Sequence, residues 1–506
     1  MPSTPYRRRT SIALGLLLAL SLSFQAHCAE QQRPPLLKPC RIDGMPNELQ
    51  CGVIQRPLDP AHPQGVQIGI HFAVVPAMAR NKQPDPVLLL AGGPGQGAID
   101  LAPAVLGRLS RLNNRRDLVF IDQRGTGRSA PLQCEKDDEE KLSLAEAADP
   151  QAQIRRLAKC QQDLTLLPYG RDGGLRFFTT TIAMQDFEAV REALGAPQWN
   201  LVGASYGTRA GLEYLRQYSS RVRRAVLDGV APPDMVLPDS FSVDNQAALD
   251  AVFAACEADA AACAKTYPRL RTEWEQLLHG LPRQVTAANP RTGVPETFTL
   301  SREMLLRGVR APLYAPMLAA ALPAAIHDAA ASQRYEGLLG LAGALGAGGG
   351  RKGAGRLAGG MHFSVICAED VPRLAADSKR GADFGNIDAE MYAQACKTWP
   401  RGEVPAAFYT LPPAPAPVLL LSGGADPVTP PRHGARVAAA LGPKALQVVV
   451  PQAGHGVSAL ACMRDVLFRF IDAKTEAEAL QPPDAACATK IPRPPAFIPV
   501  QATDNK

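Results

Sequence analysis

Short, solidly apolar segments recur along the chain, most of them bounded by glycine, aspartate or proline. They lie at residues 87–90, 118–121, 201–202, 225–227, 418–421 and 448–450. Strands buried on both faces carry continuous apolar sequence of this kind, as in a parallel sheet covered by helices. A segment at 66–75 partly alternates and predicts a half-buried strand. Helical patterns at 180–194 and 206–218 lie between strands, so we expect an α/β fold with a mostly parallel central sheet and helices on both faces.

The pattern changes between residues 236 and 400. This stretch is rich in alanine, has mostly helical periodicity and contains no clear buried parallel strand. We interpret it as a helical cap insertion, which divides the core into a first part at 35–235 and a C-terminal part at 401–506. Such insertions usually cover the site at the strand ends. A tract rich in glycine and alanine at 337–360 is expected to be a flexible surface loop, or alternatively the mobile rim of a substrate pocket.

The N-terminus has the features of an export signal. Three arginines at 7–9 precede an apolar run at 12–24, and small residues follow around 26–29. A helix needs about 20 apolar residues to span a bilayer, so this run is too short for an ordinary anchor. We predict a cleaved signal peptide at 1–28 and a periplasmic or extracellular protein. An uncleaved anchor and a lipidated Cys28 are the alternatives.

The cysteines indicate the same compartment. The chain has 11 of them, and removal of Cys28 with the signal peptide leaves an even number. These fall in neighbouring couples, which an oxidising compartment would join as short-loop disulfides. The predicted pairs are Cys40/Cys51, Cys134/Cys160, Cys256/Cys263, Cys367/Cys396 and Cys462/Cys487. No couple has Cys-x-x-Cys spacing with histidines nearby, so a zinc site is not expected.

Composition and charge exclude several classes of function. Hydrophobic residues make up 46% of the chain and charged residues 20%, which is ordinary for a globular protein and argues against wholesale disorder. The formal net charge of +6 falls to +3 when the three signal-peptide arginines are removed. So small a charge gives no case for a nucleic-acid partner or for stable membrane association after signal cleavage.

The motif GASYG at 203–207 is the sharpest chemical signal. It follows an apolar strand and opens a helix, which is the context of a G-x-S-x-G nucleophile elbow. The two glycines permit a tight turn and close approach of the neighbouring backbone. The turn would project the hydroxyl of Ser205 above the sheet, at the positive end of the following helix. The alternative is a serine that only caps this helix.

A glycine-rich loop, AGGPGQG at 91–97, directly follows the strand predicted at 87–90. Acyl transfer builds negative charge on the carbonyl oxygen, and backbone N–H groups aimed at that oxygen stabilise the charge. The expected oxyanion hole combines the N–H of Gly93 with that of Tyr206. A phosphate-binding loop is disfavoured because no Gly-Lys-Ser/Thr follows. A plain turn remains the alternative.

A serine hydroxyl needs a base, which an acid must orient. His455 lies in a Gly-His-Gly segment just past a late apolar strand, where this architecture delivers its base. Asp426 follows the strand at 418–421 through a short loop, and Asp228 ends an earlier strand. Both aspartates satisfy the chain order Ser, Asp, His. We favour Asp426 as the acid and expect Asp228 to bind nearby loop amides.

Five motifs occur in order along the chain: GGPG at 92–95, DQRGTGRS at 122–129, GASYG at 203–207, GADPVTP at 424–430 and GHG at 454–456. Together they resemble the α/β-hydrolase serine peptidases of the proline iminopeptidase and tripeptidyl aminopeptidase group, which cut at a free N-terminus. The resemblance covers about 85–235 and 400–475. It implies an α/β-hydrolase fold with Ser205 as nucleophile, Asp426 as acid and His455 as base.

The chain departs from the iminopeptidase pattern at Ala91, where that group usually has histidine. The departure favours the larger, secreted tripeptidyl type and puts strict specificity for N-terminal proline in doubt. In the segment 122–129, Arg124 and Arg128 are expected to pair with Asp122 and brace the glycine-rich loop. Direct contact of these arginines with substrate is the alternative.

An aminopeptidase must also bind an ammonium group, which a carboxylate sheltered from water does well. The segment CAED at 367–370 is similar to a Cys-x-Glu segment of the tripeptidyl group, so Glu369 is our candidate for the amine anchor. A solvated acid on a loop is the alternative.

The residues therefore predict an exported serine exopeptidase that hydrolyses peptide bonds near a free N-terminus through an acyl-enzyme. Its partners would be peptides with a free N-terminus, and no metal or organic cofactor is implied. A carboxylic-ester hydrolase with the same triad is the first alternative, because fold does not determine substrate. A non-catalytic secreted binding protein is the second, which an intact Ser205, Asp426 and His455 set disfavours.

Overall fold

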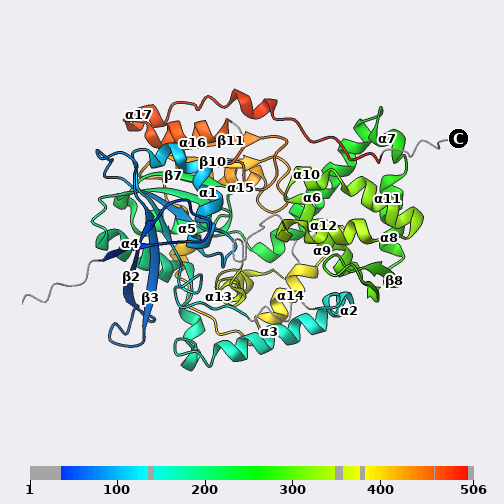
Figure 1. Cartoon of the computed structure of the whole chain (residues 1–506), viewed down its shortest axis with the longest axis horizontal. Coiled ribbons are helices and arrows are strands. Elements are labelled where there is room, and N and C mark those ends of the chain that lie inside the picture. Colours follow the sequence, from blue (N-terminus) through cyan, green and yellow to red (C-terminus); the bar gives the residue numbers. More distant parts are fainter. Residues whose placement is uncertain (1–35, 135–141, 348–356, 376–381, 461, 500–506) are drawn as a thin grey trace, which may run out of the picture. The chain divides into compact units, whose positions relative to one another are not determined.

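A nine-stranded sheet runs through the computed structural model (Figure 1). The structure describes residues 36–134, 142–347, 357–375, 382–460 and 462–499, so the signal peptide predicted at 1–28 lies outside it. The strand order is β1-β2-β3-β5-β4-β6-β7-β10-β11. The strands are β1 (Leu37–Cys40), β2 (Leu49–Pro57), β3 (Gln67–Val75), β4 (Val87–Leu90), β5 (Leu118–Ile121), β6 (Trp199–Ala204), β7 (Val222–Asp228), β10 (Val418–Gly423) and β11 (Ala445–Val450).

Six neighbouring strands of this sheet, from β5 to β11 in spatial order, run parallel to one another. The strands β1, β2 and β3 extend the sheet on the β5 side with antiparallel pairing. Each of the six apolar runs in the sequence lies within one of the parallel strands. A mostly parallel central sheet is thus confirmed, and its continuous apolar sequence follows from burial on both faces.

Helices cover both faces of the sheet (Figure 1). Val87 and Leu89 of β4 belong to the same apolar cluster as residues of α1 and α16. Side chains alternate across a strand, and Gly211 of α5 lies against Leu90, on the opposite face. The core helices are α1 (Ala98–Asn113), α4 (Thr180–Ala193), α5 (Tyr206–Gln217), α15 (Pro431–Leu441), α16 (Met463–Asp472) and α17 (Glu476–Ala479).

The cap insertion interrupts the chain between the adjacent parallel strands β7 and β10. Two helices that precede α4, α2 (Leu144–Ala148) and α3 (Pro150–Leu164), contact it. Its helices are α6 (Leu237–Ala258), α7 (Cys263–Thr266), α8 (Leu270–His279), α9 (Arg302–Leu313), α10 (Pro316–Ala319), α11 (Leu322–Ser332), α12 (Glu336–Ala347), α13 (Gly359–Glu369) and α14 (Ile387–Ala395).

Two features of the insertion differ from the sequence-based expectation. A two-stranded antiparallel sheet, β8 (Arg283–Ala288) with β9 (Pro295–Leu300), lies within the otherwise helical stretch. The flexible loop expected at 337–360 is wrong for 337–347, which belong to α12, and for 359–360, which begin α13, whereas residues 348–356 lie outside the described residues. Leu338 is buried there and α12 packs on α9, so tertiary burial of its apolar side overrides the low helix propensity of its glycines.

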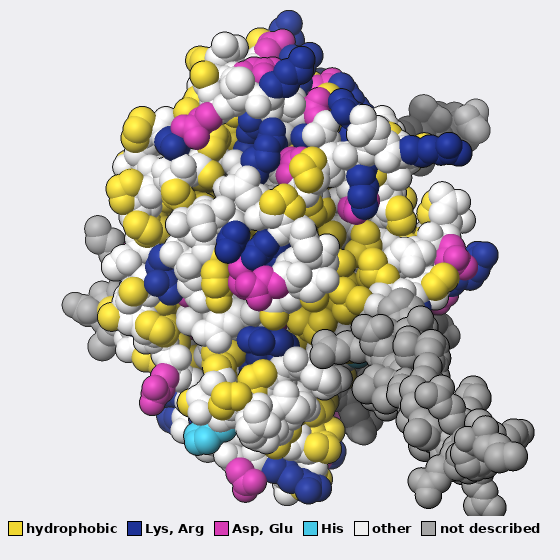
Figure 2. Space-filling model, turned by 90° about the vertical axis from the view of Figure 1, so that its left-hand side faces the viewer, with side chains coloured by type: hydrophobic (Ala, Val, Ile, Leu, Met, Phe, Trp, Pro, Cys, Tyr) yellow, Lys and Arg dark blue, Asp and Glu magenta, His cyan; other side chains and the backbone are white. Residues whose placement is uncertain are grey.

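The ten described cysteines are joined in the five predicted pairs. Each closes a loop between neighbouring segments, with sequence separations from 7 to 29 residues. On the face shown in Figure 2, Lys and Arg side chains are interspersed with Asp and Glu side chains and with apolar ones.

Candidate active site

The elbow at the end of β6 holds Ser205 in a strained backbone conformation. Its φ is 55° and its ψ is −126°, a region that residues with a side chain seldom occupy. The Ser205 N–H donates to the carbonyl of Asp228 at 2.9 Å, and the Ser205 carbonyl accepts from the N–H of Thr208 at 2.8 Å. A serine fixed in this way between a strand and a helix has the geometry of a nucleophile elbow.

Close backbone contacts require the two glycines of the elbow. A Cβ added at Gly207 would lie 2.1 Å from the carbonyl oxygen of Leu90, and one at Gly203 would lie 2.5 Å from the carbonyl oxygen of Gly207. The start of α5 therefore packs directly against the end of β4, where the glycine-rich loop begins.

The glycine-rich loop lies against the elbow. A Cβ added at Gly92 would lie 3.3 Å from Cβ of Ser205 and 3.1 Å from the carbonyl oxygen of Ala204. Gly93 has a φ of 110°, which favours glycine. The other expected oxyanion donor, Tyr206, is the first residue of α5, where N–H groups have no acceptor within the helix. Tyr206 is thus next to the candidate nucleophile in sequence, and the loop that contains Gly93 contacts it through Gly92.

The candidate base and acid contact each other directly. Nδ1 of His455 lies 2.8 Å from Oδ2 of Asp426. Because an ionised carboxylate only accepts hydrogen bonds, Nδ1 carries a proton, and in the neutral ring Nε2 therefore keeps a lone pair. Asp426 also accepts from the N–H groups of Val428 and Thr429, each at 2.9 Å, and from the Thr429 hydroxyl at 2.8 Å. These contacts hold the imidazole in the tautomer that can take a proton from a serine.

Electrostatics at this position keep Asp426 ionised and make His455 a stronger base. Burial of Asp426 would raise its pKa, but the charge of His455 and the hydrogen bonds to the carboxylate bring that pKa below its ordinary value. Burial would likewise lower the pKa of His455, whose side chain is 17% exposed, yet Asp426 raises that pKa above its ordinary value. Asp426 therefore stays ionised at neutral pH and stabilises the imidazolium that forms when His455 accepts a proton.

Asp228, the alternative acid, binds the loop that carries the base. Its carboxylate accepts from the N–H of Val457 at 2.9 Å and from the N–H of Ser458 at 2.8 Å. Its backbone carbonyl accepts from the N–H of Ser205. Asp228 thus connects the elbow to the loop of His455, whereas Asp426 accepts the hydrogen bond from the imidazole.

Tyr314, at the end of α9 in the cap insertion, contacts His455, and no sequence motif marked it. The two rings meet edge-on with their centroids 5.3 Å apart. The N–H of His455 donates to the Tyr314 carbonyl at 2.9 Å. A Cβ added at Gly454 would lie 2.3 Å from the same carbonyl oxygen, which explains the glycine before the base. The cap insertion therefore contributes directly to the position of His455.

Glu369, the candidate amine anchor, is the last residue of α13, and its side chain is fully buried. Oε1 accepts from the N–H of Thr180 at 2.7 Å, and Oε2 lies 3.5 Å from Nη1 of Arg209. Arg209 also pairs with both oxygens of Asp370, at 2.9 and 3.1 Å. Burial raises the pKa of Glu369 to about 7, although Arg209 and the Thr180 N–H act in the opposite direction. A substrate ammonium could reach this carboxylate only by displacing an internal partner.

The segment 122–129 braces the glycine-rich loop through partners other than those expected. Asp122 accepts from the N–H groups of Ile99 and Arg128, each at 3.0 Å. Arg124 is buried and pairs with Asp186 of α4 at 2.7 Å, so its expected pairing with Asp122 is wrong. Arg128 contributes its backbone amide. Asp122 thus fixes the start of α1, immediately after the glycine-rich loop, and burial raises its pKa to about 6.

The described residues contain other features outside this site. A cavity of about 250 Å³ between the cap insertion and the helices α2 and α3 is lined mostly by apolar side chains, among them Met304 of α9 and Leu338 of α12, and by none of the candidate catalytic residues. Among the described residues, no group of three or more His, Cys, Asp and Glu side chains is arranged to hold a metal ion.

Comparison with known families assigns the class that the sheet and the elbow indicate. Residues 85–252 match the family model described as "alpha/beta hydrolase fold", a stretch that includes the glycine-rich loop and Ser205. Residues 382–487 match the model described as "TAP-like protein", a stretch that includes Asp426 and His455. The chain thus has an α/β-hydrolase fold.

The curated relatives include proteins named as peptidases and one named as an esterase. The tripeptidyl aminopeptidase of Streptomyces lividans is 31% identical over 204 residues, which is 38% of this chain and 38% of that protein. Serine protease Hip1 of Mycobacterium tuberculosis is 31% identical over 210 residues, 39% of each chain. A Mycobacterium tuberculosis protein named carboxylesterase B is 28% identical over 435 residues, 78% of each chain. The chain thus matches only about two-fifths of the length of the relatives named as peptidases.

Proposed function

We propose that this α/β hydrolase is a serine aminopeptidase that cleaves peptide bonds near a free N-terminus. The observation that carries the proposal is the 2.8 Å contact between His455 Nδ1 and Asp426, which leaves Nε2 as a base. A strained serine at the elbow and a glycine-rich loop packed against it complete the set of groups that acyl transfer needs.

The proposed reaction proceeds through an acyl-enzyme. His455 Nε2 takes the proton of Ser205 Oγ as that oxygen attacks the substrate carbonyl carbon. The N–H groups of Gly93 and Tyr206 stabilise the oxyanion. The imidazolium then gives its proton to the leaving nitrogen, and the C–N bond breaks. Water, deprotonated by His455, hydrolyses the ester and regenerates Ser205.

Two observations support a peptide substrate with a free amine. Two of the relatives are named tripeptidyl aminopeptidase and serine protease, and a TAP-like segment carries the proposed acid and base. The acidic pair Glu369 and Asp370 ends the α13 helix, and α13 packs along the glycine-rich loop. Glu369 stays our candidate amine anchor, on the condition that substrate displaces the Thr180 N–H or Arg209 from its carboxylate.

A carboxylic-ester hydrolase with the same triad is the second candidate. The observation that favours it is the alignment with the protein named carboxylesterase B, which extends over 78% of each chain. Esters and amides pass through the same kind of tetrahedral intermediate, so the proposed triad serves either substrate.

One substrate panel separates these functions. The mature chain and its Ser205→Ala variant would be assayed on tripeptide anilides with a free amine, on the same anilides after N-acetylation, and on short-chain nitrophenyl esters. We expect free-amine anilides to be turned over at least tenfold faster, in kcat/KM, than the blocked ones, with turnover abolished in Ser205→Ala. Equal rates on free and blocked anilides would contradict the aminopeptidase. Hydrolysis of the esters alone would support the esterase.

Export of the protein is a further part of the proposal. Five disulfides are typical of an oxidising compartment. No helix in the described ranges combines the length and the apolar character that a membrane span requires. Expression of the full chain in a Gram-negative host should yield a mature form without residues 1–28, outside the cytoplasm and resistant to thiol alkylation before reduction. An unprocessed cytoplasmic chain with alkylated thiols would contradict export.

A further inference from the structure

A short segment of the cap insertion lies along the glycine-rich loop. Leu357 forms an antiparallel bridge with Gln96, and the N–H of Ala358 donates to the carbonyl of Gly95 at 2.8 Å. A Cβ added at Gly93 would lie 2.8 Å from a Leu357 methyl carbon. The loop that carries a proposed oxyanion donor is therefore in direct contact with the cap insertion on one side, as it is with the elbow on the other.

His362, one turn into α13, contacts the glycine-rich loop through a side-chain hydrogen bond. Its Nδ1 lies 3.1 Å from the carbonyl oxygen of Pro94, the residue that follows Gly93. A carbonyl only accepts, so Nδ1 carries the proton and donates it to this bond. Nε2 lies 2.8 Å from the hydroxyl of Tyr392 in α14, so Nε2 accepts from that hydroxyl. Burial lowers the pKa of His362, which favours this neutral tautomer.

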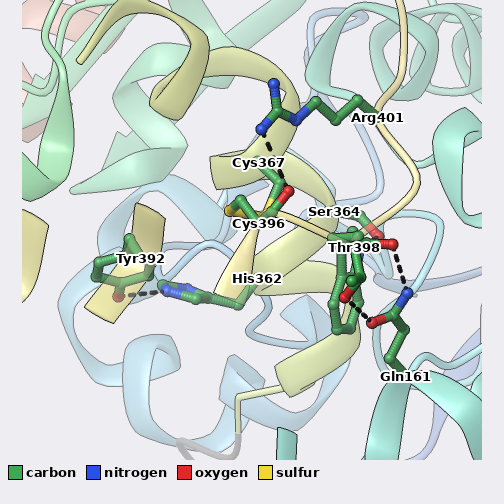
Figure 3. The surroundings of a disulfide bond; sticks show 9 residues. Gln161, His362, Ser364, Cys367, Tyr392, Cys396, Thr398 and Arg401 are labelled. Atoms are coloured by element: carbon green, nitrogen blue, oxygen red, sulfur yellow. Dashed lines mark hydrogen bonds between the residues drawn. A yellow bond between two sulfur atoms is a disulfide. The ribbon is translucent and has the colours of Figure 1, made fainter. Parts of the chain in front are cut away.

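A disulfide holds the two helices that carry this pair. Cys367 in α13 is bonded to Cys396 at the end of α14. His362 precedes the first cysteine, and Tyr392 the second, by about one helical turn. Figure 3 shows His362 and Tyr392 facing each other across the two helices, with the disulfide between the same helices. The imidazole that binds the loop is thus itself fixed at its far nitrogen.

We infer that His362 is a positioning residue for the oxyanion hole. By donating to Pro94, it fixes a loop whose glycines would otherwise allow many backbone conformations, and so directs the N–H of Gly93 at the developing negative charge. The cap insertion, through the pair His362 and Tyr392, therefore completes the oxyanion hole. The inference rests on the proposed serine hydrolase chemistry but on no particular substrate.

Three substitutions at one position test this role. In His362→Asn, the side-chain amide nitrogen takes a place close to that of Nδ1, so the bond to Pro94 is kept. In His362→Gln, the amide reaches the place of Nε2 and Tyr392, and the bond to Pro94 is lost. His362→Ala removes both. His327→Ala, at a partly exposed histidine that contacts Glu273 in the cap insertion, is the control.

The readout is the rate at which an alkyl fluorophosphonate labels Ser205. In this reaction the serine oxygen bonds to phosphorus, fluoride leaves, and the phosphoryl oxygen occupies the oxyanion hole, so no substrate needs to be known. We expect His362→Ala and His362→Gln to label about 10- to 100-fold more slowly than the wild type, in the range seen when an oxyanion donor is misplaced. His362→Asn should stay within about threefold of the wild type by the same reasoning.

A purely structural role would give a different result. The apparent pKa of the labelling rate reports His455 and should be the same in all His362 variants, because the base is not altered. Labelling of His362→Gln at the rate of His362→Asn would overturn the inference. It would also be overturned if both variants label more slowly than the wild type in proportion to their loss of melting temperature. If His362→Ala does not fold, the comparison of the Asn and Gln variants still decides. Rapid labelling without aminopeptidase activity would contradict the proposed substrate and leave this inference standing, whereas a wild type that does not label would overturn both.

Discussion

The imidazole of His455 stands edge-on against the ring of Tyr314, with centroids 5.3 Å apart and an interplanar angle of 77°. The backbone N–H of His455 also donates to the carbonyl of Tyr314. One residue of the cap insertion thus fixes both the ring and the backbone of the proposed base. Together with the bond from His362 to Pro94, this contact makes the insertion part of the proposed catalytic site.

Substitution of Tyr314 should separate the role of its ring from that of its hydroxyl. We expect Tyr314→Ala to lower kcat about tenfold, because the imidazole loses the surface that limits its rotation, and small misplacements of reacting groups are costly. Tyr314→Phe keeps the ring and should stay near the wild type. The backbone bond to His455 persists in both variants. Steady-state kcat and KM on one substrate check this, and an equal loss in both variants would assign the effect to the hydroxyl.

Asp426→Asn should lower kcat by about 10⁴-fold, because the amide no longer selects the tautomer with a free Nε2. The pH dependence gives a second test. In the wild type, activity should be lost as pH falls through a value above the ordinary 6.5 of histidine, because Asp426 raises the pKa of His455. In Asp426→Asn that cause is gone and burial lowers the pKa, so the acid limb should move to lower pH. If the acid limb of the pH–activity profile does not move, a group other than His455 determines it.

Asp228→Ala should affect stability more than chemistry. It removes the acceptor of the buried N–H groups of Val457 and Ser458, which costs about 1–3 kcal/mol when a buried donor is left unpaired. We expect a lower melting temperature and a loss of kcat far smaller than that of Asp426→Ala. A loss of kcat as large as that of Asp426→Ala would instead make Asp228 the acid of the triad.

The sequence predicts those parts of the fold whose signals are local. Six apolar runs correspond to the six parallel strands, because burial on both faces leaves no polar position. The strands of the hairpin β8–β9 carry exposed polar residues at alternate positions, such as Thr297 in β9, and β2 is mostly half-buried, with Gln55 exposed. Such short, partly polar segments are easily confused with turns. The helix α12 has no local signal of this kind, because glycines are unfavourable in a helix; its packing on α9 and α11 stabilises it.

In the candidate site, too, only residues with a local sequence signal can be predicted. Ser205 follows its strand directly, and Asp426 and His455 follow theirs after short loops. Each lies in a motif with glycines, so their places can be inferred from local sequence. Tyr314 and His362 have no such signature. Their roles arise where the cap insertion contacts loops that lie 141 and 268 residues away in the chain, contacts that depend on the whole fold.

Glu369→Gln should change how stability depends on pH. An ordinary glutamate has a pKa of 4.5, and burial raises the pKa of Glu369 to about 7 in the folded chain. The folded state therefore holds this proton more tightly than the unfolded state, and stability is lost as pH rises from the first value to the second. The glutamine does not titrate but still offers Oε1 to the N–H of Thr180.

Relative to Glu369→Gln, the wild type should thus lose about 3 kcal/mol of unfolding free energy between pH 4.5 and 7 and change little above that range. Asp122, whose pKa burial also raises, is present in both chains and cancels in the difference. Chemical denaturation of both proteins at a series of pH values measures it. Parallel stability curves would show that Glu369 stays ionised beside Arg209 throughout this range, and such an ionised carboxylate would be the stronger candidate for binding a substrate ammonium.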